Sequence, residues 1–222
     1  MLAKVSSGYV IGVNAHSVDV EVDVANGMPS FSVVGLPDAS IRESRNRIRS
    51  AIRNSGFAFP ETRITVNLSP ADIKKEGVGF DLPIALGILG ATSILEQEEI
   101  NNILFCGELS LNGKLKHFRG ALPIAMSLKH RFKTFILPNT NALEAANIDT
   151  IFVYGAESLN KVIDHLKKIK PLKQTTIDTN TYFKKNPHTE LDFRDVKGQN
   201  HIKRGLEVAA SGNHNVLKTW TQ

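Results

Sequence analysis

The strict alternation of residues 16–24 constrains the fold of this chain more than any other feature. The run is His-Ser-Val-Asp-Val-Glu-Val-Asp-Val, which places valines on one face of an extended strand and acids on the other. Asn26-Gly27 supplies turn residues directly after it, so residues 30–34 are predicted to return as a second strand. Two further strands are predicted at residues 4–11 and 63–68. The amino-terminal part therefore predicts a half-buried sheet.

Helical segments are interleaved with these strands. Ser40 and Glu43 have the spacing of a capping box, in which a hydroxyl and a carboxylate satisfy backbone donors at a helix start. Ser55-Gly56 provides a left-handed stop, so we expect a helix from residue 40 to residue 54. Further helices are predicted at 81–95, 120–130 and 158–169, with strands at 134–137 and 151–154. This order indicates one mixed α/β domain over residues 1–169.

The charge of the chain is divided unevenly. The net charge is +5, but residues 161–222 hold 12 lysines and arginines against six acids, whereas residues 1–160 hold 15 against 16. Residues 170–190 lack periodicity and contain two prolines and a Thr/Asn/Asp cluster, which predicts a basic linker. Residues 191–222 form a third segment, with a new helix beginning near Gln199. The basic excess therefore belongs to the tail and does not by itself identify a nucleic-acid-binding domain.

Several classes of protein are excluded by what the sequence lacks. No apolar run approaches the roughly 20 residues that span a bilayer, and the first residues lack the apolar core of a secretory signal. No membrane partner is therefore expected. Cys106 is the single cysteine, which excludes a disulfide framework and fits a reducing cytoplasm. The seven histidines never pair at a ligand-like spacing, so no metal site is predicted.

A stripe of arginines follows one face of the predicted helix over residues 40–54. Its members are Arg42, Arg45, Arg49 and Arg53. At 3.6 residues per turn they lie on neighbouring positions of the helix surface, beside an apolar stripe of isoleucines. Four guanidinium groups on one face could bind phosphates of a nucleic acid. The alternative is a solvated face whose charges form salt bridges within the protein.

Four longer motifs occur along the chain in a definite order. They are Gly35-Leu36-Pro37-Asp38, the segment from Val66 to Leu86 (VNLSPADIKKEGVGFDLPIAL), Gly107-Glu108-Leu109-Ser110-Leu111-Asn112-Gly113, and Asp195-Val196-Lys197-Gly198-Gln199. With these motifs the chain strongly resembles the amino-terminal part of the magnesium-chelatase-like YifB/ComM family over residues 1–217. Despite the family's name, no residue pattern here indicates a site for magnesium or porphyrin.

The resemblance implies a Lon-protease-type fold, which is an α/β domain shared with a ribosomal protein. Lon-type enzymes use a serine nucleophile that is activated by a lysine. Here the serine position falls on Gly79 and the lysine position falls on Leu122, so both halves of the dyad are missing. A divergent serine peptidase could use Ser69 with Lys74 or Lys75 instead, although Ser69-Pro70 is more typical of a strand-end turn.

The fourth motif resembles the entry to an AAA+ ATPase module. In the family this turn packs near the adenine, which makes Val196, Gly198 and Gln199 vestigial adenine-side contacts. Lys218-Thr219 superficially matches the end of a phosphate loop, but no glycine precedes it within the span of such a loop. We therefore expect a truncated or frameshifted member of the family, without the Walker A and B motifs.

The resemblance also implies a function. Full-length members are similar to ring-forming AAA+ motors that use ATP and Mg²⁺ to process DNA, including branch migration during natural transformation. For this chain we expect no bound cofactor, no ATPase activity and a role as a non-catalytic domain, with DNA as the candidate partner. The alternatives are an independent DNA- or protein-binding module that uses Arg42 to Arg53, and the divergent peptidase.

Overall fold

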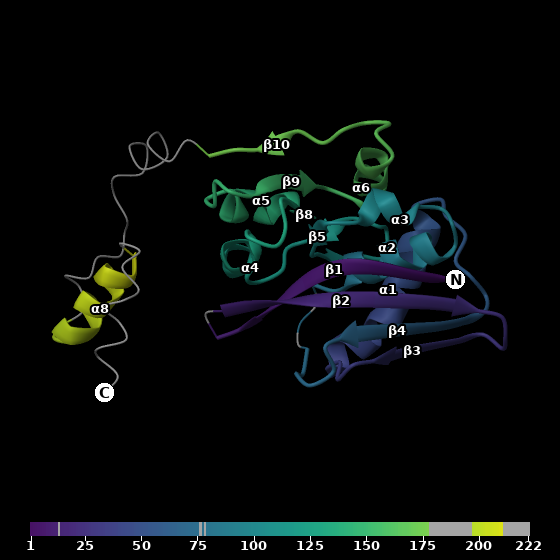
Figure 1. Ribbon diagram of the computed structural model, residues 1–222, viewed down its shortest axis with the longest axis horizontal. Coiled ribbons are helices and arrows are strands. Elements are labelled where there is room, and N and C mark those ends of the chain that lie inside the picture. Colours follow the sequence, from purple (N-terminus) through teal and green to yellow (C-terminus); the bar gives the residue numbers. More distant parts are fainter. Residues whose placement is uncertain (13, 76, 78, 178–196, 211–222) are drawn as a thin grey trace. The chain divides into compact units, whose positions relative to one another are not determined.

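The computed structural model describes residues 1–12, 14–75, 77, 79–177 and 197–210 of the chain. It divides into two compact units, Met1–Ile177 and Asp178–Gln222. The first unit contains the sheet and most of the helices (Figure 1). From the second unit the structure describes the helix α8 (Asn200–Ala210) and the three residues before it.

The first unit is built on an eight-stranded mixed sheet. Its strand order is β10-β9-β8-β5-β1-β2-β4-β3, which can be followed from top to bottom in Figure 1. The strands are β1 (Leu2–Ile11), β2 (Asn14–Ala25), β3 (Ser30–Val34), β4 (Arg63–Ser69), β5 (Ile103–Phe105), β8 (Thr134–Pro138), β9 (Phe152–Ala156) and β10 (Gln174–Thr175). The β1–β5, β5–β8, β8–β9 and β3–β4 pairs are parallel, and the other three pairs are antiparallel. A mixed α/β fold is therefore confirmed.

The alternating run forms β2, as predicted. Val18, Val20 and Val22 are fully buried, and the acids between them lie on the half-exposed face. The expectation that residues 30–34 return beside this strand was wrong. β4 lies between β2 and β3, pairing antiparallel with β2 and parallel with β3. Asn26-Gly27 does turn the chain, but β4 occupies the hydrogen-bonding edge of β2 that a hairpin partner would have used.

Helices cover both faces of the sheet. On one face the core includes residues of α1 (Ala39–Asn54), α2 (Asp81–Ala91) and α6 (Leu159–Leu166). On the other face the core includes residues of α4 (Ala121–Leu128) and α5 (Asn139–Ala145). The remaining elements are the short helix α3 (Gln97–Ile100) and the hairpin of β6 (Glu108–Leu109) and β7 (Leu115–Lys116).

The start of α1 and the end of α2 differ from the predicted helix ends. The amino-terminal cap of α1 is Asp38, whose side chain accepts a hydrogen bond from the Ile41 amide, and Ser40 lies inside the first turn. The helix α2 ends at Ala91, four residues before the predicted end, and Ser93 follows with a left-handed φ of 58°. In the described residues, no helix is long and apolar enough to cross a bilayer.

The first unit extends beyond residue 169, where the sequence placed the start of the linker. β10 pairs antiparallel with β9, matching Gln174 with Tyr154 and Thr175 with Val153. The amide of Leu172 also donates a hydrogen bond to Nδ1 of His165 in α6, at 2.9 Å. These contacts attach residues 170–177 to the sheet, so the compact unit reaches Ile177.

Candidate functional site: a cleft beside Gly79

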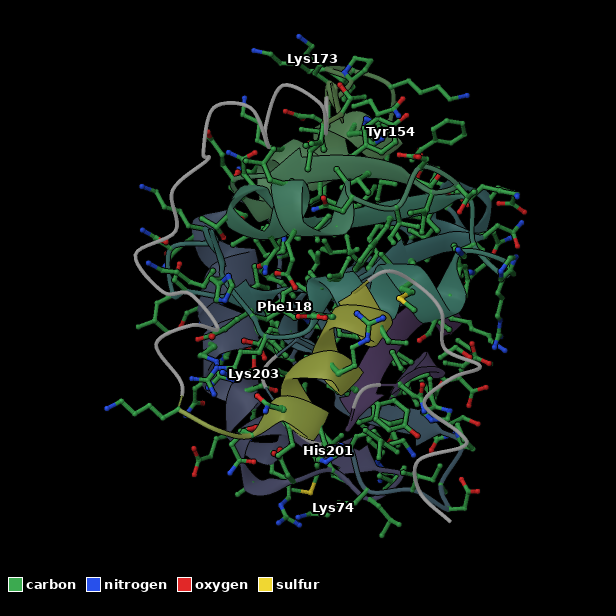
Figure 2. All side chains as sticks on the ribbon, turned by 90° about the vertical axis from the view of Figure 1, so that its left-hand side faces the viewer. Lys74, Phe118, Tyr154, Lys173, His201 and Lys203 are labelled. Carbon is green, nitrogen blue, oxygen red and sulfur yellow. The ribbon has the colours of Figure 1, made fainter. Side chains whose placement is uncertain are left out.

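Residues from two of the sequence motifs and from two other segments line one cleft of about 720 Å³ in the first unit. The start of α1 contributes Asp38 and Ser40, and the loop before α2 contributes Gly77 and Gly79. The segment between β7 and α4 contributes His117, Phe118 and Arg119, of which Phe118 is labelled in Figure 2. The strand β1 completes the wall with Gly8, Tyr9 and Val10. Segments that are far apart in the sequence therefore meet at one site.

The structure places the Lon serine position in the wall of this cleft. A Cβ atom at Gly79 would lie 3.6 Å from the Phe118 ring, which is an ordinary contact distance. The carbonyl of Gly79 accepts a hydrogen bond from the Gly107 amide at 2.9 Å. Leu122, at the lysine position, is half-buried in the first turn of α4, and its amide donates to Oε1 of Glu144 at 2.9 Å. These two positions hold neither a hydroxyl nor an amine, so they provide no dyad.

Asp38 ties the start of α1 to the loop before α2. Its Oδ1 accepts hydrogen bonds from the Ile41 amide (2.9 Å) and the Ser40 hydroxyl (2.8 Å), and its Oδ2 accepts from the Gly77 amide (3.1 Å). Burial by itself opposes ionisation of this carboxyl. The three hydrogen bonds and the charge of Lys74 outweigh burial, so the pKa of Asp38 is lowered. The carboxylate is therefore ionised and fully used in holding the cleft.

Two polar side chains next to the cleft are buried without a partner among the described residues. They are Lys75, which is 0% exposed, and Tyr9, which is 4% exposed. Neither the Nζ of Lys75 nor the Oη of Tyr9 has a hydrogen-bond partner in that part of the chain. Burial lowers the pKa of Lys75 and raises the pKa of Tyr9, and both groups sense the charge of Asp72. Sequence reasoning noted Lys75 as a peptidase candidate but did not predict its burial.

Lys75 does not contact Ser69 in the way that the alternative peptidase would need. Ser69 lies at the end of β4, opposite Asp19 of β2. Since the Nζ of Lys75 has no described hydrogen-bond partner, it does not bind the Ser69 hydroxyl. Lys74 is exposed. The peptidase with Ser69 as nucleophile stays a prediction.

The arginine stripe of α1 separates into two halves. Arg49 and Arg53 both bind Oε1 of Glu61, with an Arg49 Nη2 distance of 2.8 Å. The Arg49 guanidinium also lies 5.8 Å from the centre of the Phe59 ring. Arg42 and Arg45 are exposed and form no ion pair within the described residues. The salt-bridged alternative therefore accounts for Arg49 and Arg53, and Arg42 and Arg45 remain available to a phosphate.

The sequence did not reveal the ion pair that joins α1 to α2. Nε and Nη2 of Arg47 donate to the Asp81 carboxylate at 2.9 and 3.2 Å, and the Leu109 amide donates to it at 3.2 Å. Asp81 is 1% exposed, and its burial raises the pKa of the carboxyl despite the two opposing hydrogen-bond donors. Nothing in the sequence distinguishes Arg47 from the other arginines of α1 as the partner of Asp81. The tertiary structure is therefore needed to identify the pair.

The remaining candidate residues do not form a metal site or a reactive thiol in the described part of the chain. No group of three His, Cys, Asp or Glu side chains that could hold a metal occurs in the described residues. Cys106 is fully buried, with its Sγ 3.6 Å from the Ser7 hydroxyl, and burial raises the pKa of its thiol to about 11. Val196 lies outside the described residues. Gly198 and Gln199 are exposed, with left-handed φ values of 73° and 57°, directly before α8.

Known proteins resemble the chain over nearly its whole length. The sequence model of "Subunit ChlI of Mg-chelatase" matches residues 20–141, and that of "Magnesium chelatase, subunit ChlI" matches residues 192–220. Competence protein ComM of Haemophilus influenzae is 39% identical over 217 residues, covering 97% of this chain and 43% of that protein. An uncharacterized YifB of Salmonella typhimurium is 38% identical over 216 residues, covering 97% of this chain and 42% of that protein.

A weaker resemblance extends to a protease. Lon protease 2 of Bacillus subtilis is 25% identical over 184 residues, covering 74% of this chain and 33% of that protein. This agrees with an α/β domain of the Lon type. The chain spans less than half the length of the curated relatives that it matches. On the family model and the two close relatives, the chain belongs to the magnesium-chelatase-like ComM/YifB family.

Proposed function

We propose that this chain supplies the non-catalytic amino-terminal domain of a ComM-like protein that processes DNA during natural transformation. The observation that supports the proposal is that Gly79 and Leu122, the positions that resemble the Lon dyad, hold neither a hydroxyl nor an amine. The similarity to a competence protein supports the connection to DNA uptake. In this proposal ATP and Mg²⁺ belong to the full-length family, and the chain itself hydrolyses neither ATP nor peptides.

The contact with DNA is assigned to the unpaired half of the arginine stripe. Arg42 and Arg45 are exposed on α1 and have no acidic partner among the described residues. Arg49 and Arg53 share the carboxylate of Glu61, which offsets one of their two charges, and a phosphate would have to compete with that carboxylate. Phosphate binding through exposed arginines is electrostatic, so it weakens as salt is added.

Filter retention of duplex DNA across a salt series tests this contact. Retention by the full chain should fall with salt, and the double change Arg42→Ala and Arg45→Ala should reduce the slope of log K against log salt by about 2. A variant with Lys133→Ala and Lys173→Ala removes two exposed charges elsewhere in the first unit and should leave the slope close to that of the parent. Equal loss in both double variants, or no retention at low salt, would refute the assignment.

A chimera tests the function in a cell. The aligned amino-terminal segment of Haemophilus influenzae ComM is replaced by residues 1–217 of this chain, and transformation frequency is measured. We expect a frequency well above that of a strain lacking ComM, with a loss in the Arg42 and Arg45 double variant. A frequency no higher than in the deletion strain, from a chimera that accumulates normally, would contradict the proposal.

The peptidase alternative has a direct test. A serine-directed fluorophosphonate probe should not label the chain. Labelling that disappears in Ser69→Ala would establish the peptidase in place of the non-catalytic domain.

A further inference from the structure

The two Asn-Gly pairs of the chain lie in opposite structural settings. They are Asn26-Gly27, between β2 and β3, and Asn112-Gly113, between β6 and β7. In an Asn-Gly pair the backbone nitrogen of the glycine can attack the asparagine side chain, because glycine has no Cβ atom to obstruct the approach. The sequence makes the two pairs alike in this respect, so a difference between them comes from the fold.

The loop that holds Asn26 crosses a strand and does not close a tight hairpin. Arg63 of β4 pairs both with Ala25 at the end of β2 and with Ser30 at the start of β3. Residues 26–29 therefore span two strand spacings of about 4.8 Å each, across the start of β4. Figure 1 shows β4 between β2 and β3. A loop stretched in this way does not form the hydrogen bonds of a two-residue hairpin turn.

The Asn26-Gly27 pair is free to rearrange. Among the described residues, neither the Gly27 N–H nor the Asn26 side-chain amide has a hydrogen-bond partner, and both residues are exposed. The side-chain carbonyl carbon of Asn26 can therefore turn toward the Gly27 nitrogen without breaking a described contact.

A guanidinium group lies beside this pair. A Cβ atom at Gly27 would lie 3.5 Å from Nη2 and 3.6 Å from Nε of Arg63. Arg63 is exposed and forms no ion pair with a described residue. Attack on the Asn26 side chain requires the Gly27 nitrogen to lose its proton, and it places negative charge on the side-chain oxygen. A nearby cation favours both changes.

Hydrogen bonds hold the second pair in place. Oδ1 of Asn112 accepts from the Ser110 hydroxyl at 2.8 Å and from the Lys114 amide at 3.2 Å. The Gly113 N–H donates to the Ser110 carbonyl, and the Gly113 carbonyl accepts from the Leu159 amide, both at 2.9 Å. Gly113 is also buried. Its nitrogen therefore does not reach the Asn112 side chain unless these bonds open.

We propose that Asn26 is a site of spontaneous deamidation in the folded chain and that the fold protects Asn112 from the same reaction. The Gly27 nitrogen loses its proton and bonds to Cγ of Asn26. The Cγ–Nδ2 bond breaks, and ammonia leaves with that proton, which closes a succinimide ring. Water then opens the ring at one of its two carbonyl carbons and gives aspartate or isoaspartate. The sum is the loss of one ammonia and the gain of one water.

The product changes the charge of the loop and its chemistry. Residues 24–37 contain no acidic or basic side chain, so the new carboxylate is the first charge in this segment, beside Arg63. Isoaspartate also lengthens the main chain by one atom, and residues 26–29 have no described backbone hydrogen bond that this would break. An exposed isoaspartyl carboxylate is a substrate for an isoaspartate O-methyltransferase. The proposal does not depend on the role in DNA processing.

Peptide mapping of the full chain by mass spectrometry, after incubation at neutral to mildly alkaline pH, provides the test. We expect aspartate and isoaspartate to accumulate at position 26 at least tenfold faster than at position 112. Methyl transfer from S-adenosylmethionine by an isoaspartate O-methyltransferase should label the peptide that contains position 26. In urea, where the fold is lost, the two rates should agree within about twofold. Equal rates in the folded chain, a faster reaction at Asn112, or a difference that persists in urea would overturn the proposal.

Variants identify the site and the part played by the guanidinium. Asn26→Gln should abolish the product at position 26, because the longer side chain would have to close a larger ring. Arg63→Gln should slow deamidation of Asn26 at least threefold. Lys133→Gln removes one exposed positive charge elsewhere in the first unit and should leave the rate unchanged. Equal effects of Arg63→Gln and Lys133→Gln would refute the role of Arg63, and an undiminished product in Asn26→Gln would refute the site.

Discussion

Replacing Arg47 with methionine tests how the wall of the cleft is held. In the protein the Asp81 carboxylate is 1% exposed and accepts three hydrogen bonds, two of them from Arg47. Methionine fills a similar volume but offers no donor and no charge. In Arg47→Met, the Leu109 amide is the one described donor that still binds the buried Asp81 carboxylate. The expected result is a large loss of stability through Asp81, although Asp81 itself is unchanged.

The size of the loss follows from the burial of the two partners. Removing one partner of a buried ion pair costs about 3–5 kcal/mol. The Arg47 side chain is 25% exposed, so water can reach part of the vacated space, and we expect the lower end, about 3 kcal/mol. Arg47 opposes the burial that raises the pKa of Asp81, so without Arg47 that pKa rises further.

The loss should depend on pH with a definite sign. A carboxyl whose folded pKa lies above its unfolded value of about 3.9 binds more protons in the folded state, so stability falls as pH rises between the two values. The difference between Arg47→Met and the parent should therefore be small near pH 4 and grow toward pH 7. Below the unfolded pKa the carboxyl is neutral in both states, and the remaining cost is the lost packing and hydrogen bonds.

Urea unfolding followed by circular dichroism at several pH values measures these differences. Arg45→Met is the matched control, since Arg45 is an exposed arginine of the same helix, and it should change the free energy of unfolding by less than about 0.5 kcal/mol. Adding Asp81→Asn to Arg47→Met should restore part of the loss near pH 7. A loss below about 1 kcal/mol near pH 7, or a loss that shrinks as pH rises, would refute the reasoning.

Three further perturbations have outcomes that the structure fixes. Lys75→Met should raise the free energy of unfolding near pH 7 by about 1 kcal/mol, because it removes a buried ammonium without a described partner. Burial lowers the folded pKa of Lys75, so this gain in stability should shrink as pH rises toward the unfolded pKa of about 10.4. A gain that grows with pH would contradict the prediction. Gly35→Ala should lower the free energy of unfolding by roughly 2–4 kcal/mol, measured by thermal or urea unfolding. The new Cβ atom would lie 2.2 Å from the Leu68 carbonyl oxygen, and the backbone there has a φ of +90°. An unchanged free energy of unfolding would show that the turn relaxes easily. Cys106, with a thiol pKa of about 11, should react with iodoacetamide near pH 8 only as fast as the chain unfolds, and rapid alkylation of the folded protein would refute its burial.

The fold could be predicted where a segment has a strong period of its own. β2 and α1 are long, and their apolar residues recur every second residue or along one helical face, so both were found within two residues of their ends. α2 is apolar on all sides and gave no stop signal, which explains why its end was placed too late. β6, β7 and β10 contain two residues each and form because a partner strand is present, which no local pattern reveals.

The site could be predicted only in part, for a related reason. Two of the motifs contribute Asp38, Gly77 and Gly79 to the cleft, whereas residues 8–10 and 117–119 lie outside every motif. They did not show that Asp38 binds the Gly77 amide, or that Arg47 binds Asp81, since each pair joins residues more than 30 positions apart. The division of the arginine stripe likewise depends on Glu61, which approaches Arg49 and Arg53 from the loop after α1.

The residue at position 79 and the shape of the cleft are independent of each other in physical terms. Gly79 does not have a left-handed backbone, and a Cβ atom there meets the Phe118 ring at an ordinary distance, so the fold accommodates a side chain at this position. The backbone therefore does not force a glycine at position 79. The walls are held instead by the bonds of Asp38 to Gly77, of Gly107 to Gly79 and of Arg47 to Asp81, none of which needs a catalytic group. Because none of these bonds involves a side chain at position 79 or 122, the shape of the cleft does not depend on a peptidase dyad.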